Sequence, residues 1–142
     1  MSGEDFIQDI PGEHTKSRVT ELVLLGDATE EQVMFRAPFR CRVQSIEITP
    51  DADVTGDNTN RKNLNIINKG SDGNGVTEVA SLNLIAGTDL NQADGTVIPL
   101  TAGEILLAEG DVLAVEIEQV GTGVTIPRSE WEVRYLADRS GV

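Results

Sequence analysis

Hydrophobic and polar residues alternate in short runs along most of the chain, and clusters of Gly, Asp, Asn and Pro separate the runs. These four residue types supply the backbone angles that turns require. The pattern predicts strands at residues 18–25, 32–37, 40–49, 62–68, 78–84, 96–100, 105–107, 111–120 and 130–136. Many short strands at such spacing indicate an all-β fold, an antiparallel β-sandwich or jelly-roll-like domain of about eight or nine strands.

The alternation is clearest near the C-terminus. Residues 113, 115 and 117 are apolar, whereas Glu116 and Glu118 are charged, and the run 130–136 repeats the pattern. A period of two places one face of each strand in the core and the other in water. The predicted core residues are Cys41, Val43, Ile46, Ile48, Leu64, Ile66, Leu113, Val115, Ile117, Trp131, Val133 and Tyr135.

One strand changes phase along its length. Cys41 and Val43 are apolar at odd positions, but Ile46 and Ile48 are apolar at even positions. A β-bulge at Gln44–Ser45 would reset the register and bend the strand.

The first 17 residues are polar and carry Gly and Pro as breakers, which predicts an extended N-terminal arm at 1–17 before a single domain at 18–142. Phe6, Ile7 and Ile10 are the exceptions. They either tuck against their own domain, stay exposed, or anchor the arm on a neighbouring subunit. The arm also lacks the basic start and apolar stretch of a secretory signal, so we expect synthesis in a cytoplasm without export by that route.

The chain has 24 acidic and 11 basic residues, and a formal net charge of -13. Nucleic-acid binding depends on Lys and Arg neutralising phosphates, so an acidic chain argues against that class of partner. The same repulsion argues against anionic membrane surfaces, and no apolar run approaches the ~20 residues of a membrane span. We therefore expect neither nucleic acid nor membrane as a partner.

The sequence offers little for catalysis or metal binding. Its only histidine, His14, lies in the predicted arm, and its only cysteine, Cys41, lies in an apolar run. A nucleophile needs an adjacent base, and a zinc site needs about four ligands. Paired carboxylates could serve glycoside hydrolysis, but the acidic residues fall mostly in turns or on the polar faces of strands. We expect a protein without catalytic residues, metal or cofactor.

Two loops superficially suggest ligand binding. Residues 51–58 place oxygen-bearing side chains at alternate positions with Gly56 sixth, as a calcium loop does, but Lys62 stands where the bidentate Glu is required. A long solvated connection is the preferred interpretation. The glycine-rich stretch 69–75 is followed by a strand rather than a helix, which indicates a hairpin turn instead of a phosphate-binding loop.

The region from Ala37 to Leu136 resembles the capsid decoration, or head-stabilising, proteins of tailed bacteriophages, which have a β-sandwich or jelly-roll core. The segments that carry this resemblance are 37–43, 46–50, 56–60, 64–70, 75–77, 107–113 and 120–124. They are strand-and-turn patterns rather than a catalytic signature.

The resemblance implies a structural virion protein that binds the exterior of an expanded capsid and clamps adjacent major capsid subunits. It implies a homotrimer, the major capsid protein as partner, and an N-terminal arm that reaches a neighbour, for which Phe6, Ile7 and Ile10 are suited. Two alternatives remain open. One is another virion accessory β-module of a head fibre, tail or baseplate, and the other is a carbohydrate-binding domain without catalytic activity.

Overall fold

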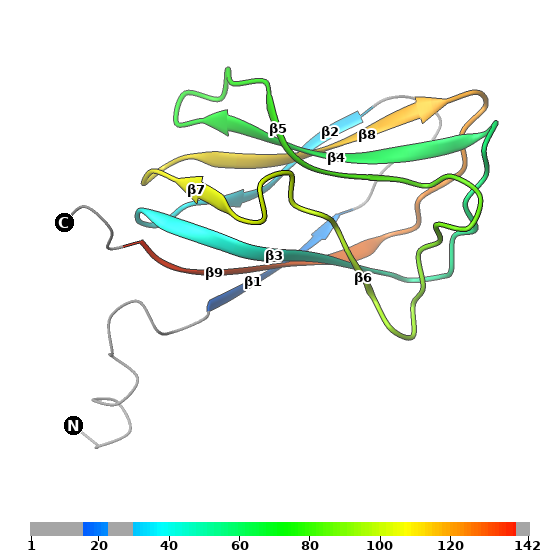
Figure 1. Cartoon of the computed structure of the whole chain (residues 1–142), viewed down its shortest axis with the longest axis horizontal. Coiled ribbons are helices and arrows are strands. Elements are labelled where there is room, and N and C mark those ends of the chain that lie inside the picture. The colour runs from blue at the N-terminus through cyan, green and yellow to red at the C-terminus, as the bar shows by residue number, and fades with distance from the viewer. Residues whose placement is uncertain (1–15, 23–29, 139–142) are drawn as a thin grey trace.

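The described part of the chain is a β-sandwich of two antiparallel sheets (Figure 1). The structure, a computed structural model, describes residues 16–22 and 30–138, with side chains from residue 31 onwards. The strands are β1 Lys16–Leu22, β2 Glu30–Arg36, β3 Cys41–Pro50, β4 Arg61–Gly70, β5 Thr77–Asn83, β6 Thr96–Val97, β7 Ile105–Leu107, β8 Val112–Val120 and β9 Ser129–Ala137. The predicted all-β sandwich is confirmed, and the described residues contain no helix long and apolar enough to cross a membrane.

Consecutive strands mostly alternate between the two sheets. One sheet has the order β1-β9-β3-β6, with β7 also paired to β3, and the other has the order β2-β8-β4-β5. The short strands β6 and β7 lie along the same edge of β3, one near each end of it. Together they act as one interrupted edge strand.

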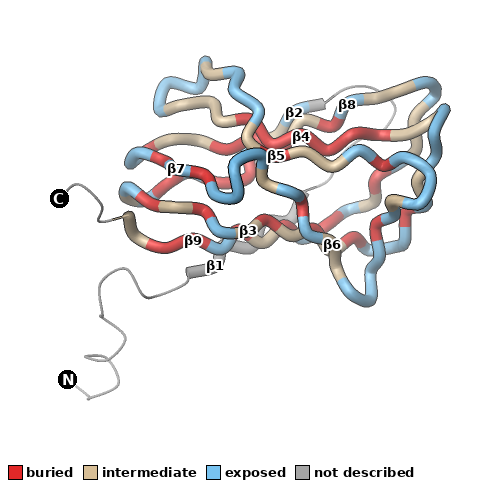
Figure 2. The backbone as a smooth tube through the Cα atoms, viewed as in Figure 1, coloured by how far each residue is buried: buried red, intermediate tan, exposed pale blue. Residues whose placement is uncertain are grey.

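The core lies between the sheets, where the buried positions of each strand face one another (Figure 2). Every residue predicted for the core is buried, including Trp131, which stands directly opposite Ile48 in the sheet register. Val, Leu and Ile supply most of this core, because the chain has only 4% aromatic residues.

The predicted bulge in β3 is confirmed. The register between β3 and β9 shifts between Val43 and Ser45, and Cys41, Val43, Ile46 and Ile48 all face the core. The apolar residues change from odd to even positions along β3, and the extra residue of the bulge turns the side chains of Ile46 and Ile48 back towards the core. β3 pairs with β9 on both sides of the bulge and remains in one sheet.

One side of the sandwich is closed by the segment between β6 and β7. Leu100 forms a bridge with Ala80 of β5, and backbone bonds join Ser81 N to Pro99 O (3.2 Å) and Thr101 N to Val79 O (3.0 Å). The segment therefore connects the edge of one sheet to the edge of the other. The predicted strand at 96–100 is wrong in length, because only Thr96 and Val97 pair with β3 as a strand before the chain crosses to β5.

Most other strands differ from expectation by one or two residues at their ends, and the first strand differs most. β1 begins at Lys16, so residues 16 and 17 belong to a strand rather than to the predicted arm. β1 ends at Leu22, and residues 23–25 of the predicted first strand lie outside the described residues. The glycine-rich stretch 69–75 is the predicted hairpin turn between β4 and β5, with Gly70 and Gly73 in the left-handed region.

Candidate functional site

Three long connections meet at one end of the sandwich, on the right in Figure 1. They are residues 51–60, 84–95 and 121–128, and we call them together the loop end. Val54 and Leu90 form an isolated bridge between the first two connections, and Asn60 Oδ1 accepts a bond from Thr122 N (2.9 Å) between the first and third.

Asp51 and Arg128 prolong the pairing of β3 and β9 into the loop end. Asp51 N donates to Arg128 O (2.9 Å), and Arg128 Nε donates to Asp51 Oδ2 (3.1 Å). Both side chains are more than half exposed, so this ion pair is worth little in stability. Its backbone bond nevertheless fixes the point from which the two connections diverge.

Asp53, Asp57 and Asp89 of the loop end accept bonds from backbone N–H groups. Asp53 Oδ1 accepts from Gln92 N (2.8 Å), and Asp89 Oδ1 accepts from Gly56 N (2.7 Å). Asp57 Oδ1 accepts from both Asn60 N and Thr59 N (2.7 Å each), and these bonds lower the pKa of Asp57. Bonds to the charged form of a carboxylate favour that form.

These carboxylates therefore serve separate turns instead of converging on one point. Within residues 16–22 and 30–138, no group of three or more His, Cys, Asp or Glu side chains is arranged to hold a metal ion. The preferred interpretation of 51–58 as a solvated connection is wrong for Val54, which is buried and belongs to the core.

Gly56 allows the first two connections to approach closely. A Cβ atom at this position would collide with the carbonyl oxygens of Ile85 and Thr88. Asn58 adds a further link, since its Oδ1 accepts a bond from Ala86 N (3.0 Å). Hydrogen bonds between the connections therefore hold the loop end in one arrangement.

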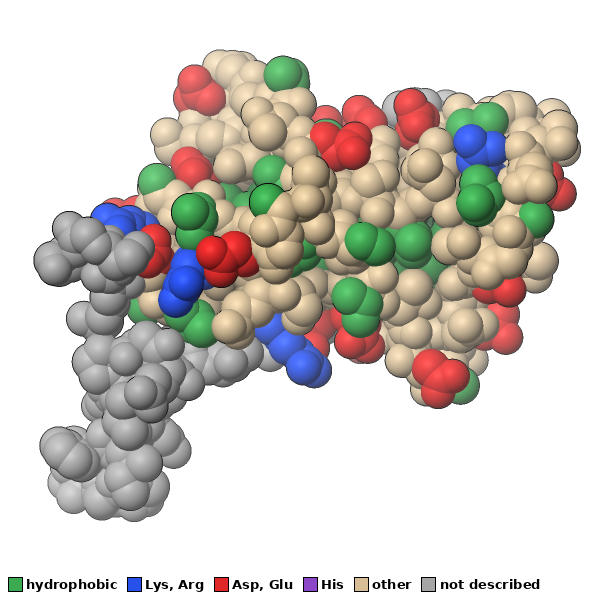
Figure 3. Space-filling model, viewed as in Figure 1, with side chains coloured by type: hydrophobic (Ala, Val, Ile, Leu, Met, Phe, Trp, Pro, Cys, Tyr) green, Lys and Arg blue, Asp and Glu red, His purple; other side chains and the backbone are tan. Residues whose placement is uncertain are grey.

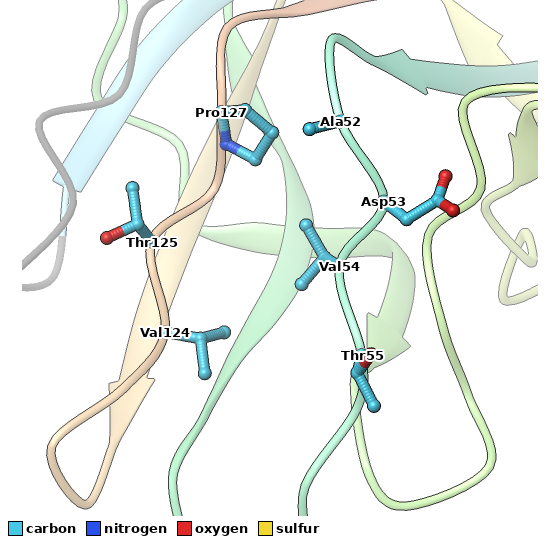
Figure 4. A pocket seen from close by; sticks show the side chains of 7 residues that line it. All are labelled: Ala52, Asp53, Val54, Thr55, Val124, Thr125 and Pro127. Carbon is cyan, nitrogen blue, oxygen red and sulfur yellow. The ribbon is translucent and has the colours of Figure 1, made fainter.

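A shallow hollow of about 430 Å³ opens between residues 52–55 and 124–127, and we call it the loop-end hollow. Figure 4 shows Ala52, Val54, Val124 and Pro127 turned towards the space between the two segments, whereas Asp53 points away from it. The lining is mainly apolar, and it is presented by two segments that the bonds described above hold in place.

A second surface lies on the side formed by β5, β6 and β7, which faces the viewer in Figure 3. Four large apolar side chains on or next to these strands are exposed: Val76 (83%), Leu106 (60%), Val97 (57%) and Ile85 (42%). Figure 3 shows hydrophobic side chains across the middle of this side, with acidic side chains both among them and at its margins. We call it the β5–β7 side. Val33, the other large exposed apolar residue among those described, lies on β2.

Cys41 is fully buried in β3. Burial first, and then the charges of Asp111 and Asp138, raise the pKa of its thiol to about 11. A thiol with such a pKa is protonated at neutral pH and is a poor nucleophile.

The predicted arm residues Phe6, Ile7 and Ile10 lie outside the described residues, as does His14. The structure therefore does not place them relative to either surface. Sequence reasoning in turn missed the residues of the loop end. The available signals were the isolated apolar residues Val54, Leu90 and Ile126 in otherwise polar loops, all three of which are buried.

No protein-family model matches the sequence, and comparisons with curated proteins and with solved structures gave no match.

Proposed function

We propose that the chain is a structural virion protein that decorates the head of a tailed bacteriophage. In this proposal it binds the outer surface of the expanded capsid and stabilises the head by clamping adjacent major capsid subunits. The observation that carries the proposal is the β5–β7 side, where Val76, Ile85, Val97 and Leu106 are exposed. Apolar residues gathered on one side of a domain are typical of a surface that contacts another protein.

The strand order supports the same proposal. With β6 and β7 taken as one interrupted strand, β1-β9-β3-β6 faces β2-β8-β4-β5, which is the double Greek-key order of jelly-roll domains. Jelly rolls are frequent in viral capsid proteins, although lectins and cupins share them. Fold alone does not determine function, so the order supports the resemblance of residues 37–136 without replacing it.

The charge of the chain is compatible with the capsid exterior. A net charge of -13 repels packaged nucleic acid, and a protein on the outer surface has no contact with the genome. The charge also opposes unspecific self-association in solution.

Symmetry supplies a physical reason for a homotrimer. A threefold position on an icosahedral shell is filled by one closed trimer, in which each subunit offers the same surface to its neighbour in the shell. Several weak contacts per trimer then add by avidity, so each contact can be small. The exposed residues of the β5–β7 side suit such a contact with the major capsid protein or with a neighbouring copy.

Co-sedimentation with undecorated, expanded heads of the phage that encodes the chain tests the proposal. We expect saturable binding with a copy number that is a multiple of three, and decorated heads that resist heat or low ionic strength better than bare heads. The double variant Val97→Glu/Leu106→Glu should bind more weakly, whereas Val33→Glu, an exposed apolar position on β2, should bind like the unmodified protein. Absence of any binding to expanded heads would contradict the proposal.

A further inference from the structure

We infer that the loop-end hollow is a binding pocket for one apolar side chain of a partner polypeptide that carries Lys or Arg next to that side chain. The inference goes beyond the proposed function and does not depend on the partner being a capsid protein. It concerns the hollow between residues 52–55 and 124–127, and none of the residues that line it belongs to the exposed apolar set of the β5–β7 side.

The two walls of the hollow are fixed before any ligand arrives. Residues 52–55 are held by the Val54–Leu90 bridge and by the bond from Gln92 N to Asp53. Residues 124–127 follow Thr122, which is bound to Asn60, and precede Arg128, which is bound to Asp51. A preformed pocket loses little conformational entropy on binding, which is the general reason that such sites bind better than mobile ones.

The lining of the hollow is mainly apolar, and its size suits a single side chain. Ala52, Val54, Val124 and Pro127 turn towards the hollow and present methyl and methylene groups (Figure 4). A volume of about 430 Å³ lies at the lower end of the range of ligand pockets, which is roughly 300–1,000 Å³. The hollow is therefore suited to one large aliphatic or aromatic side chain rather than to a whole helix.

The loop end is rich in acidic residues. The three connections of the loop end contain five aspartates, Asp51, Asp53, Asp57, Asp89 and Asp94, and one basic residue, Arg128. Arg61 of β4 adds a second positive charge, because its Nη1 donates to Asn58 O (2.8 Å). Arg128 is already paired with Asp51. The connections that form the loop end therefore carry more acidic than basic side chains, although Asp53 itself points away from the lining (Figure 4).

The acidic character of the loop end favours a positively charged partner. Complementary charge attracts a segment with Lys or Arg beside its apolar side chain and repels an acidic segment, including an acidic surface of a second copy of this chain. The carboxylates bind separate backbone groups and do not converge, so we expect a peptide cation rather than a chelated metal ion to neutralise them.

Titration by NMR with short blocked peptides tests the inference on the full chain, labelled at its Val and Leu methyl groups. The probe is Ac-Lys-Leu-Lys-NH2, and the matched probes are Ac-Glu-Leu-Glu-NH2, which reverses the charge, and Ac-Lys-Ala-Lys-NH2, which removes the large side chain. We expect saturable shifts of the Val54 and Val124 methyl signals with the first peptide. Each matched peptide should bind with a Kd about tenfold higher or not at all.

Two variants separate the contributions of the lining and the charge. Val124→Asp should abolish the shift of Val54, whereas Val97→Asp, a matched change on the β5–β7 side, should leave the Kd unchanged. Asp53→Asn keeps an oxygen acceptor for Gln92 N but removes the charge, so it should raise the Kd about threefold without changing the spectrum elsewhere.

Three outcomes overturn the inference: no shift at Val54 and Val124 with millimolar peptide, equal binding of the basic and acidic peptides, or shifts centred on Val33 or Val97. The titration contains no phage heads, so its failure would leave the co-sedimentation result untouched, and failure of co-sedimentation would leave the titration untouched.

Discussion

At the scale of single residues, Trp131 is the largest side chain that β9 places between the sheets. It is fully buried, opposite Ile48, and its indole N–H has no acceptor among the described residues. Trp131→Ala should lower the free energy of unfolding by ~3–5 kcal/mol, because it removes a large apolar group and leaves a cavity. Trp131→Phe should lower it by less, since it keeps a ring and removes an unpaired buried donor.

Urea denaturation followed by circular dichroism measures both changes, because Trp131 is the only tryptophan and its fluorescence is lost in the variants. Val97→Ala is the control, and at an exposed position it should change the free energy of unfolding by no more than ~0.5 kcal/mol. An unchanged transition midpoint for Trp131→Ala would show that the two faces of β9 are reversed.

Asp57 gives the loop end a dependence on pH. Its pKa is lowered because its carboxylate accepts bonds from Asn60 N and Thr59 N. A group with a lowered pKa in the folded state stabilises the fold above its ordinary pKa, and this contribution is lost as pH falls through the folded value. Asp57→Ala should therefore be less stable than the unmodified protein at pH 7, and the difference should shrink below about pH 4.

Thermal unfolding of both proteins between acidic and neutral pH checks this expectation. Asp57→Asn is the matched variant, because it keeps an oxygen acceptor for the turn but has no proton to lose. Its stability relative to the unmodified protein should also improve in acid. A difference between Asp57→Ala and the unmodified protein that is constant across the whole range would contradict the assignment.

At the scale of elements, an ion pair ties together two strands that are not neighbours. Lys69 Nζ of β4 lies 2.9 Å from Glu31 Oε1 of β2, and β8 lies between these strands. The Lys69 side chain must therefore cross β8, beside Ala114, which is fully buried although it does not belong to the core between the sheets. Lys69 also offsets the repulsion between Glu31 and Glu116, which stand directly opposite each other.

Loss of the Lys69 charge and loss of its aliphatic side-chain stem should lower the free energy of unfolding by different amounts. Lys69→Met keeps an apolar stem over β8, so we expect a loss of up to ~1 kcal/mol in the free energy of unfolding at low salt and a smaller loss at about 1 M salt. Lys69→Ala also uncovers Ala114 and should lose more, largely independent of salt. Urea denaturation at both ionic strengths measures the two effects, and identical losses for both variants would contradict the crossing.

The strands were predictable because alternation is a local property, and the change of phase between Val43 and Ile46 exposed the bulge of β3. The bulges between Val33 and Phe35 in β2, and between Ile66 and Ile67 in the pairing of β4 with β5, were not predictable. The first lies in the apolar run Val33-Met34-Phe35, where a change of phase leaves no trace in the sequence. The second skips Val79 of β5, which stands next to the small apolar residue Ala80, so alternation does not reveal it either. The loop end was missed for a different reason, since the pairing of Val54 with Leu90 depends on tertiary contact between two distant loops.

At the scale of the whole molecule, the proposed trimer predicts the mass of the protein in solution. A homotrimer in solution should have about three times the 15.3 kDa of the chain. Size-exclusion chromatography with light scattering measures this mass directly. The double variant Val97→Glu/Leu106→Glu tests whether the β5–β7 side holds the trimer together. If it does, the variant should be a monomer. A strict monomer at all concentrations would contradict the trimer in solution.

The N-terminal segment provides the last prediction. Residues 1–15 carry Phe6, Ile7 and Ile10 in an otherwise polar sequence, and every described strand begins at Lys16 or later. Deletion of residues 1–15 should therefore leave the circular dichroism spectrum and the melting temperature nearly unchanged, because all nine described strands remain in the shortened chain. Attachment to undecorated heads should weaken, since three large apolar side chains are lost from the contact.

Full-length protein with Phe6, Ile7 and Ile10 all replaced by Ser is the matched control for this deletion. It keeps the length and the acidic residues of the segment, so it separates the loss of apolar contacts from the loss of chain. Both proteins should co-sediment with heads more weakly than the unmodified protein and to a similar extent, because apolar burial rather than charge is the expected source of binding. Equal binding of the truncated and full-length proteins would exclude an anchoring role for the segment and leave the β5–β7 side and the loop-end hollow to account for attachment.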